Sequence, residues 1–552
     1  MSGQAEEGLR VDRRRAWAIA AAGVALFLLA ASVYMEPRGI FEDEAAQISG
    51  LRLGPVRLVG WLTGGRPRDH GTPIGDRMPP LSYWAGWAWS LGFGLGETSL
   101  RAFSALLTAS AILLVGLAGS RWIGAARGAT AALVLGLSPF VVAEGADIRP
   151  YAQFLALSAL CVVLWARALR SDPRATPRLL ALLVAALILC MYTHFFGVVL
   201  TAALLGSGFV LHHRAGRPVR PWLVAVAITA VASVGLAPFV RGSLELSKGN
   251  AATPGGSNDW MQMIRSIAQY FLPPVVSSAP GLLALGATAV GILGVGWLGL
   301  LIGAARRREW PRHAEILLPL AIGWLAVAAI GGASDRFEPF RPTYNLWSMP
   351  LFAIALVVPL SAAEGWVRMT TRVGLAALIL LDLLAAAECA RHREWMGHGP
   401  DMAVRRAVAK HGHGGLALVH DAGPWFRFAS IPASLEFGDG LRQYGADGQG
   451  EGEVALLPDE GRAVAPEGLD VRSIVVVRLD HVSWRQLRGR APGPVVPPRG
   501  PAASRLVANG WRLVDSEDGV ALGDAGTIWF LGVRLEVYER PEADADRPGP
   551  EK

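Results

Sequence analysis

The sequence has little cysteine and little charge for its length. Three of its 552 residues are cysteine, and Cys161 and Cys190 lie inside apolar runs while Cys389 lies at the end of one. This pattern excludes a disulfide framework and a cysteine-based metal site. Charged residues make up 18% of the chain and apolar residues 52%, whereas about 25% charge is usual in soluble domains. An ordinary soluble globular protein is therefore excluded.

The net charge of +7 does not indicate nucleic-acid binding. A nucleic-acid-binding chain gathers its basic residues on one face. Here the arginines fall between apolar runs, which is the pattern of the short cytoplasmic loops of membrane proteins. We therefore expect membrane lipid, and no nucleic acid, among the partners.

Apolar runs fill most of the first 391 residues. A helix that spans a bilayer needs about 20 residues, and we count about eleven such runs by that length. They are 16–35, 101–120, 125–143, 151–170, 178–193, 195–211, 221–240, 281–304, 314–331, 346–362 and 371–388. If the N-terminus is cytoplasmic, every arginine-rich short loop falls on the cytoplasmic side, as the positive-inside rule requires. The sequence predicts a polytopic α-helical membrane protein with its N-terminus inside.

An acidic stretch, Glu42, Asp43 and Glu44, follows the first of these runs. Carboxylates are costly in hydrocarbon and tolerable at a wet membrane boundary. One interpretation is a solvated helix cap, since acids at helix ends are ordinary. The other is a catalytic carboxylate, placed where a lipid-borne and a water-side substrate can meet.

The other segments on the predicted outer side also carry unusual polar residues at helix ends. Residues 81–95 are apolar and rich in tryptophan, which predicts an interfacial helix rather than a span. The polar residues in question are Asp76, Arg77, Glu144, Asp147, Arg149, Arg341 and Tyr344. Their gathering on one side favours a site there, because solvated loops would spread such residues over both sides.

The composition changes at about residue 392. Short apolar runs bounded by Gly and Pro are typical of strands, and a helix is expected at 401–410. The expected strands are Leu416–His420, Ile474–Val477, Trp511–Asp515 and Trp529–Tyr538. We predict a membrane domain at 1–391, a small extracytoplasmic α/β domain at 392–541 with a loop at 492–501, and a disordered tail at 542–552.

Several short motifs recur in the order found in one enzyme superfamily. After the acidic pair and Pro79-Pro80-Leu81 come Ser99 to Leu106, Ser138-Pro139, Arg149-Pro150-Tyr151, Tyr192 to Phe195, and the late Arg341, Tyr344 and Pro350. Over residues 16–350 the chain resembles the GT-C superfamily of polyprenyl-phosphate-sugar glycosyltransferases. It is most similar to the branch of protein O-mannosyltransferases, aminoarabinose-to-lipid-A transferases and rhizobial core-oligosaccharide transferases.

The resemblance implies an activity and a set of roles. It implies inverting transfer from a polyprenyl-phosphate sugar to an extracytoplasmic glycan, lipid or protein, at a bacterial plasma membrane. Asp43 matches the catalytic acid of the first loop and would take the acceptor proton, with Glu44 beside it. Donor phosphate would be held by Arg149, Tyr151, Arg341 and Arg77, although snorkelling to lipid headgroups is the plainer role for an arginine at a helix end.

Four further residues are candidates for the acceptor or a metal ion. His194 matches a family histidine, and it could orient a substrate or share a divalent ion with Asp76 or Glu44. A hydrogen-bonded core histidine is the plainer alternative. Glu144 and Asp147 would share one face if their segment is helical, and they would pair with Arg149 or contact the acceptor. No tight ligand spacing appears, so the sequence commits to no metal and no other cofactor.

The sequence differs from the family pattern in two places, and two alternative functions remain open. No large β-trefoil insertion is evident, which sets the chain apart from the mannosyltransferases and puts a protein acceptor in doubt. Asp76-Arg77-Met78-Pro79 also differs from the acidic-Lys pair of the aminoarabinose branch. A transporter or lipid-sugar flippase is the alternative function, but transporters place polar groups near the midplane. A membrane scaffold with an outer interaction domain is the other.

Overall fold

The computed structural model of the chain describes most of it. The residues described are 2–35, 42–64, 77–172, 175–248, 263–264, 267–268, 270–271, 280–307, 314–333, 339–391, 400–411, 416–420, 442–446, 454–456, 469, 471–482, 501–522 and 530–540. They divide into two compact units. A helical unit comprises Met1–Ser32, Leu53–Arg66 and Arg77–Glu388, and a sheet unit comprises Val33–Arg52, Pro67–Asp76 and Cys389–Lys552.

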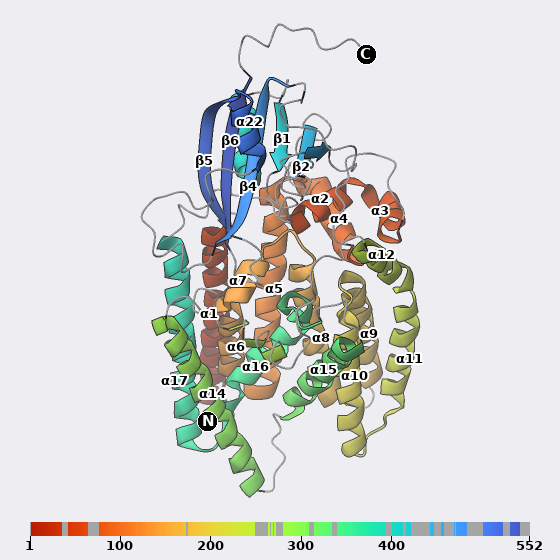
Figure 1. The fold of residues 1–552 in the computed structure, drawn as a ribbon. Coiled ribbons are helices and arrows are strands. Elements are labelled where there is room, and N and C mark those ends of the chain that lie inside the picture. The colour runs from red at the N-terminus through yellow and green to blue at the C-terminus, as the bar shows by residue number, and fades with distance from the viewer. Residues whose placement is uncertain are drawn as a thin grey trace. The chain divides into compact units, whose positions relative to one another are not determined.

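The helical unit is a bundle of long apolar helices (Figure 1). Its helices are α1 (Ser2–Met35), α3 (Gly54–Leu62), α4 (Leu81–Phe93), α5 (Glu97–Ile123), α6 (Ala125–Leu137), α7 (Pro139–Glu144), α8 (Tyr151–Arg170), α9 (Thr176–Thr193), α10 (Gly197–Arg214), α11 (Arg220–Val234), α12 (Ala237–Lys248), α14 (Pro280–Arg306), α15 (Ala314–Ala333), η2 (Pro342–Ser348), α16 (Met349–Val357), η3 (Val358–Ser361) and α17 (Gly365–Arg391). The predicted interfacial helix at 81–95 is α4.

Seven helices of the described residues are long and apolar enough to cross a membrane, or eight if the bent pair α11–α12 counts as one span. The predicted count of eleven is therefore not confirmed. Three of the predicted runs are not among these helices. The run 125–143 is divided at Ser138-Pro139 into α6 and α7, the run 195–211 lies in α10, which ends in His212, His213 and Arg214, and the run 371–388 lies in α17.

Glycine brings α5 and α6 into close contact. A Cβ on Gly128 of α6 would lie 2.4 Å from Ser120 N and 2.6 Å from Gly116 O. In a bilayer, helices associate mainly through such van der Waals packing of small residues. Helices α5, α6 and α8 thus form the centre of the bundle, and Trp165 of α8 is fully buried there.

The helical path changes direction at two places that matter for the site. Ser138 caps α7 by accepting a hydrogen bond from Val141 N at 3.4 Å, and Pro139 suits the first helical position because it lacks an N–H. Helices α11 and α12 meet at an angle of 42°. Tyr192 of α9 lies against that bend, where its hydroxyl donates to Ala232 O at 3.2 Å.

The sheet unit contains one mixed sheet of six strands in the order β3-β2-β1-β4-β6-β5. The strands are β1 (Leu416–His420), β2 (Arg442–Ala446), β3 (Val454–Leu456), β4 (Ser473–Val482), β5 (Arg512–Leu522) and β6 (Phe530–Glu539). Strand β1 pairs in parallel with β2 and β4, and the other pairings are antiparallel. The four predicted strands are present, while β2 and β3 were not predicted.

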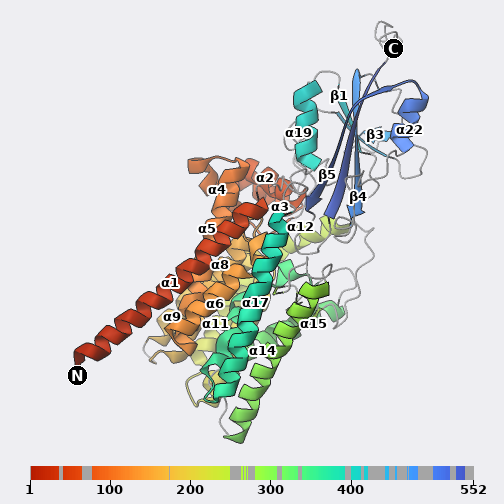
Figure 2. The same cartoon turned by 90° about the vertical axis from the view of Figure 1, so that its left-hand side faces the viewer.

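Helices cover both faces of this sheet. Figure 2 shows α19 (Pro400–His411) on one face and α22 (Pro501–Ala508) on the other. Trp511, Tyr538 and Leu506 belong to the core under α22, so this unit has its own hydrophobic core. Helix α2 (Glu42–Arg52) also belongs to the sheet unit. Of the predicted loop at 492–501, residues 492–500 lie outside the described residues, and Pro501 begins α22. The predicted tail at 542–552 also lies outside them.

Candidate functional site

Arg149 lies at the N-terminal end of α8, in the turn after α7. Its backbone N donates to Asp147 O at 2.8 Å, and Pro150 then starts the helix. The guanidinium is buried, with Nη2 donating to the Tyr151 hydroxyl at 3.1 Å. Its Cζ also lies 5.1 Å from the centre of the Tyr151 ring. Arg149 and Tyr151 are therefore in direct contact, and their predicted role in binding phosphate remains a prediction.

His194 lies at the C-terminal end of α9, where it ends the helix. It is 1% exposed, and its Nδ1 accepts a hydrogen bond from Phe196 N at 3.2 Å. An imidazolium has a proton on both nitrogens and could not accept there. The ring is therefore neutral with its proton on Nε2, which makes His194 a hydrogen-bond donor on that side.

Aromatic rings surround His194. Phe154 stacks on it at 4.7 Å between ring centres, and Phe196 lies at 5.9 Å. Tyr151 lies at 6.0 Å and Tyr344 at 5.7 Å. We call these five residues, Tyr151, Phe154, His194, Phe196 and Tyr344, the His194 cluster. It joins the ends of α8 and α9 to η2.

Arg341 lies at the other edge of the His194 cluster. It immediately precedes η2, is half-buried, and places its Cζ 5.7 Å from the centre of the Tyr344 ring. Asn345 fixes this turn by donating from Nδ2 to Pro339 O at 2.7 Å and to Arg341 O at 3.0 Å. The His194 cluster thus has a guanidinium at each of two edges, from Arg149 and Arg341, although the two arginines lie 192 positions apart in the sequence.

The acidic residues before α8 have other contacts. Glu144 and Asp147 would share one face only if their segment were helical. Helix α7 ends at Glu144, so Asp147 lies outside the helix and the two do not share a helical face. Asp147 is buried, and its Oδ1 lies 4.0 Å from Nη1 of Arg101. Ser104 also donates to its backbone O at 2.7 Å. Arg101 and Ser104 belong to the motif Ser99 to Leu106, so this motif supports the turn that carries Arg149.

Arg77 lies among different partners. Its Nη1 donates to Gly242 O of α12 at 3.1 Å, and its Cζ lies 5.6 Å from the Trp61 ring. Burial lowers the pKa of Arg77, while Glu245 and Tyr83 act in the opposite direction. A Cβ on Gly242 would lie 2.1 Å from Leu62 O, so α12 packs closely on α3 here. These contacts favour an anchoring role for Arg77, and the predicted phosphate contact remains a prediction.

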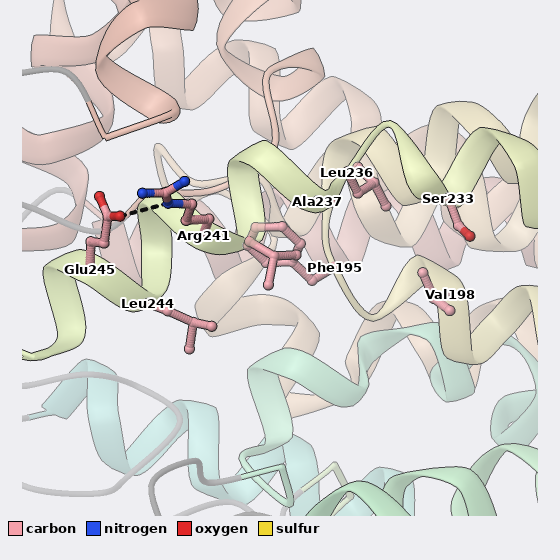
Figure 3. A pocket seen from close by; sticks show the side chains of 9 residues that line it. Phe195, Val198, Ser233, Leu236, Ala237, Arg241, Leu244 and Glu245 are labelled. Atoms are coloured by element: carbon pink, nitrogen blue, oxygen red, sulfur yellow. Dashed lines mark hydrogen bonds and ion pairs between the residues drawn. The ribbon is translucent and has the colours of Figure 1, made fainter.

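A groove of about 710 Å³ lies beside the bend between α11 and α12. It is lined by Phe195, Val198, Ser233, Leu236, Ala237, Val240, Arg241, Leu244 and Glu245. Figure 3 shows the polar pair at one end, where Arg241 Nε donates to Glu245 at 2.8 Å, and apolar side chains along the rest. Figure 3 places Phe195 between the two ends of the groove, and Phe195 directly follows His194 of the His194 cluster.

Asp43 and Glu44 lie in the first turn of α2, within the sheet unit. Glu44 is 1% exposed and Asp43 is half-buried. A fully solvated cap would leave both carboxylates exposed, so the burial of Glu44 does not fit the plainest alternative. The third predicted acid of this region, Asp76, lies outside the described residues. Among the described residues, no group of three or more His, Cys, Asp or Glu side chains gathers to hold a metal ion.

Known proteins resemble this chain in sequence over part of its length and in fold. A family model described as dolichyl-phosphate-mannose-protein mannosyltransferase matches residues 77–240, which include Arg77, Arg149 and His194. The fold is similar to that of ArnT from Cupriavidus metallidurans, whose structure was determined with bound undecaprenyl phosphate. The TM-score is 0.50 at 14% identity, over 96% of this chain and 99% of that chain. This chain has an ArnT-like fold.

Two other solved structures match this chain with lower TM-scores. The oligosaccharyltransferase of Archaeoglobus fulgidus, in complex with zinc and sulfate, matches with a TM-score of 0.41 and 12% identity, over 82% of this chain and 67% of that chain. The mycobacterial arabinofuranosyltransferase AftD matches with a TM-score of 0.43 and 16% identity, over 97% of this chain and 40% of that chain. Among the curated proteins no match was found.

Sequence reasoning missed three members of this site. Phe154 and Phe196 pack on His194, and Gln153 of α8 hydrogen-bonds Thr193 of α9. The spacing of Tyr151 and Phe154, three residues apart on one helix, could have indicated a shared aromatic face. The position of Gln153 in an otherwise apolar helix was a second signal, because polar groups in such helices are expensive unless they have a use.

Proposed function

We propose that this membrane protein transfers a sugar from a polyprenyl-phosphate donor to an acceptor outside the cytoplasm, with inversion at the anomeric carbon. The observation that carries the proposal is the pair Arg149 and Arg341 at two edges of the buried His194 cluster, on an ArnT-like fold. A pair of guanidinium groups over aromatic rings suits an anionic group that must be held in a site with little water. A lipid-linked phosphate is such a group.

Arg149 and Arg341 would act on the leaving group. When the bond between the anomeric carbon and the phosphate oxygen breaks, negative charge grows on the phosphate. Fixed cationic donors stabilise that charge more in the transition state than in the bound donor. Arginine also offers two parallel N–H groups to two phosphate oxygens. Tyr151 and Tyr344 would hold the two guanidinium groups in place through their ring contacts, and Tyr151 also through the hydrogen bond that Arg149 Nη2 donates to it.

The groove beside α11 and α12 supports a lipid-borne donor. Its walls are mainly apolar, and its volume of about 710 Å³ is in the range of small-molecule sites. One of its lining residues, Phe195, directly follows His194 of the His194 cluster. A phosphate held near that cluster could therefore extend an isoprenoid chain along the groove. The ion pair of Arg241 and Glu245 would lie at the far end of the groove from Ser233.

The acceptor side would be served by the first-loop acids. Asp43 would accept the proton of the acceptor hydroxyl as its oxygen attacks the anomeric carbon, and Glu44 would tune Asp43 or meet a divalent ion. A sugar, a glycolipid or a protein could supply that hydroxyl. In this proposal the N-terminus is cytoplasmic, and residues 392–541 form an extracytoplasmic domain at a bacterial plasma membrane.

Substitution of Asp43 tests the proposal. Purified protein in vesicles should move a labelled sugar from a polyprenyl-phosphate donor to an envelope extract. Asp43→Asn keeps the shape of the side chain and removes the proton acceptor, so transfer should fall about 10²–10⁴-fold while donor binding persists. Glu44→Gln is the matched control and should lose less. Full transfer by Asp43→Asn would remove this residue as the base, and absence of transfer from any such donor by the native chain would refute the proposed function.

A further inference from the structure

Gln153 presents a buried oxygen next to the His194 cluster. It lies on α8 between Tyr151 and Phe154, both of which contact the His194 ring. Its Nε2 donates to Thr193 Oγ1 of α9 at 3.3 Å, and Thr193 directly precedes His194. Its Oε1 is buried and has no hydrogen-bond donor among the residues that the structure describes.

The hydrogen bonds of Thr193 fix which way the Gln153 amide points. Thr193 is fully buried, and its hydroxyl donates to Leu189 O at 2.9 Å. Since a hydroxyl has a single proton to donate, Thr193 can only accept from Gln153. The NH₂ group of the amide must therefore face Thr193, and the amide oxygen must face elsewhere.

A buried oxygen of this kind is costly in a membrane protein. Leaving a polar atom without a partner away from water carries its full desolvation penalty, and hydrocarbon offers no donor to relieve it. The atom is therefore expected to accept from a molecule that enters the site. Neither the phosphate nor the isoprenoid chain of the proposed sugar donor can donate a hydrogen bond to it, because the phosphodiester anion has no proton and the chain is apolar. A sugar hydroxyl can.

We propose that Gln153 Oε1 accepts a hydrogen bond from a ring hydroxyl of the sugar carried by the donor, and so distinguishes a sugar-bearing lipid phosphate from the bare lipid phosphate. This inference rests on the proposed function. It assigns separate parts of the donor to separate residues. Arg149 and Arg341 hold the phosphate, the groove holds the chain, and Gln153 recognises the sugar.

A second oxygen supports a polar subsite in the same region. Thr343 is 1% exposed, and its Oγ1 has no hydrogen-bond partner within the described part of the chain. It immediately precedes Tyr344 of the His194 cluster, on η2, and η2 packs against α8. A hydroxyl can donate as well as accept, so Thr343 suits a second sugar hydroxyl.

The test compares binding of two kinds of lipid by the full-length protein in detergent. The probes are undecaprenyl phosphate and a panel of undecaprenyl-phosphate hexoses and pentoses. The measured quantity is the ratio of their affinities. The native protein should prefer at least one sugar-bearing lipid, and Gln153→Met, which keeps the side-chain length without polar atoms, should reduce that preference about fivefold to tenfold. Its affinity for undecaprenyl phosphate should not change.

Two further variants separate recognition from structural support. Thr193→Val removes the same hydrogen bond between α8 and α9 but keeps the amide oxygen, so it should preserve most of the preference. Thr201→Val is the control. Like Thr193, Thr201 is buried and its hydroxyl donates to the backbone oxygen four residues earlier, Gly197 O, at 2.8 Å. A purely structural role for Gln153 would make Gln153→Met and Thr193→Val equal in effect.

The outcomes are distinguishable. A preference that survives in Gln153→Met, or a native ratio of one for every sugar, overturns the sugar contact and leaves the proposed function standing. An equal loss for bare and sugar-bearing lipids in Gln153→Met also overturns it, because the amide would then only support the fold. If the native protein binds neither kind of lipid, the proposed function fails and the sugar contact falls with it.

Discussion

Arg77 and Arg149 are buried in the same manner but have different partners. Arg77 is 8% exposed and lies 5.6 Å from the Trp61 ring, and Arg149 is 7% exposed and lies 5.1 Å from the Tyr151 ring. Arg77 donates to a backbone oxygen of α12 and feels the charge of Glu245. Arg149 donates to the Tyr151 hydroxyl and lies at one edge of the His194 cluster, which has Arg341 at another edge.

The difference suggests how each charge is used. A guanidinium that faces a carbonyl and a carboxylate of its own chain is satisfied by the fold, and its loss should appear in stability. In the proposed function, Arg149 and Arg341 at two edges of the His194 cluster bind the donor phosphate, so the loss of either should appear in ligand affinity. The following substitutions separate the two cases.

The largest effect is expected at Arg149 and Arg341. Replacing either with Ala removes charge-assisted hydrogen bonds worth about 1.5–3 kcal/mol, so the Kd for undecaprenyl phosphate should rise about 10-fold to 150-fold. Lys should restore only part of the affinity, because a point charge lacks the bidentate fork. Binding of labelled lipid to purified protein measures this.

Arg170 provides the matched control for those variants. It belongs to the last turn of α8, and its Cζ lies 5.6 Å from the Trp122 ring. It thus repeats the arrangement of an arginine over a ring at the opposite end of the same helix from Arg149. Arg170→Ala should leave donor affinity unchanged, and a loss equal to that of Arg149→Ala would mean that any such arginine merely stabilises the helix.

A smaller effect, on stability rather than binding, is expected where Arg77 meets α12. Gly242→Ala would place a Cβ 2.1 Å from Leu62 O, and overpacking of this kind costs on the order of 1–3 kcal/mol. Arg77→Ala should lower the Tm in detergent in the same direction. Gly291 of α14 has open space around it, so Gly291→Ala is the control and should not lower the Tm. If the Tm is unchanged in both Gly242→Ala and Arg77→Ala, the contact between Arg77 and α12 does not stabilise the fold, and Arg77 no longer differs from Arg149 in this respect.

The smallest effect is expected at Glu245. Its side chain is 41% exposed, and exposed ion pairs contribute at most about 1 kcal/mol. Glu245→Gln should therefore lower the Tm slightly and should do so less at high salt, because salt screens the attraction. Undecaprenyl phosphate affinity should stay the same. A large loss of affinity would mean that Glu245, which lines the end of the groove, contacts the donor phosphate together with Arg77.

The sequence predicted much of the fold because membrane spans and strands have strong local patterns. Strands β1, β4, β5 and β6 were each found from an apolar run between turn residues. Strand β2, Arg442–Ala446, is polar and contains glycine, and β3 has only three residues, so neither carries such a pattern. The predicted count of eleven spans is not confirmed over the described residues, where the run 125–143 is divided at Ser138-Pro139 and α10 ends in a polar turn.

The site was predicted less completely than the fold. Arg149, His194 and Arg341 were indicated because each stands at the end of an apolar run. Which aromatic residues join them depends on how α8, α9 and η2 meet, and that contact is set by tertiary packing. Gln153 shows the limit most clearly, since the direction of its amide follows only from the proton that Thr193 gives to Leu189.

A double-mutant cycle at Arg149 and Arg341 tests the central claim most directly. The Kd for undecaprenyl phosphate is measured for the native protein, both Ala variants and the double variant. If both arginines hold one phosphate, each single change weakens binding at least about 10-fold, and the double change costs less than the sum, with a coupling of about 1 kcal/mol or more. Native affinity in both single variants would contradict the account.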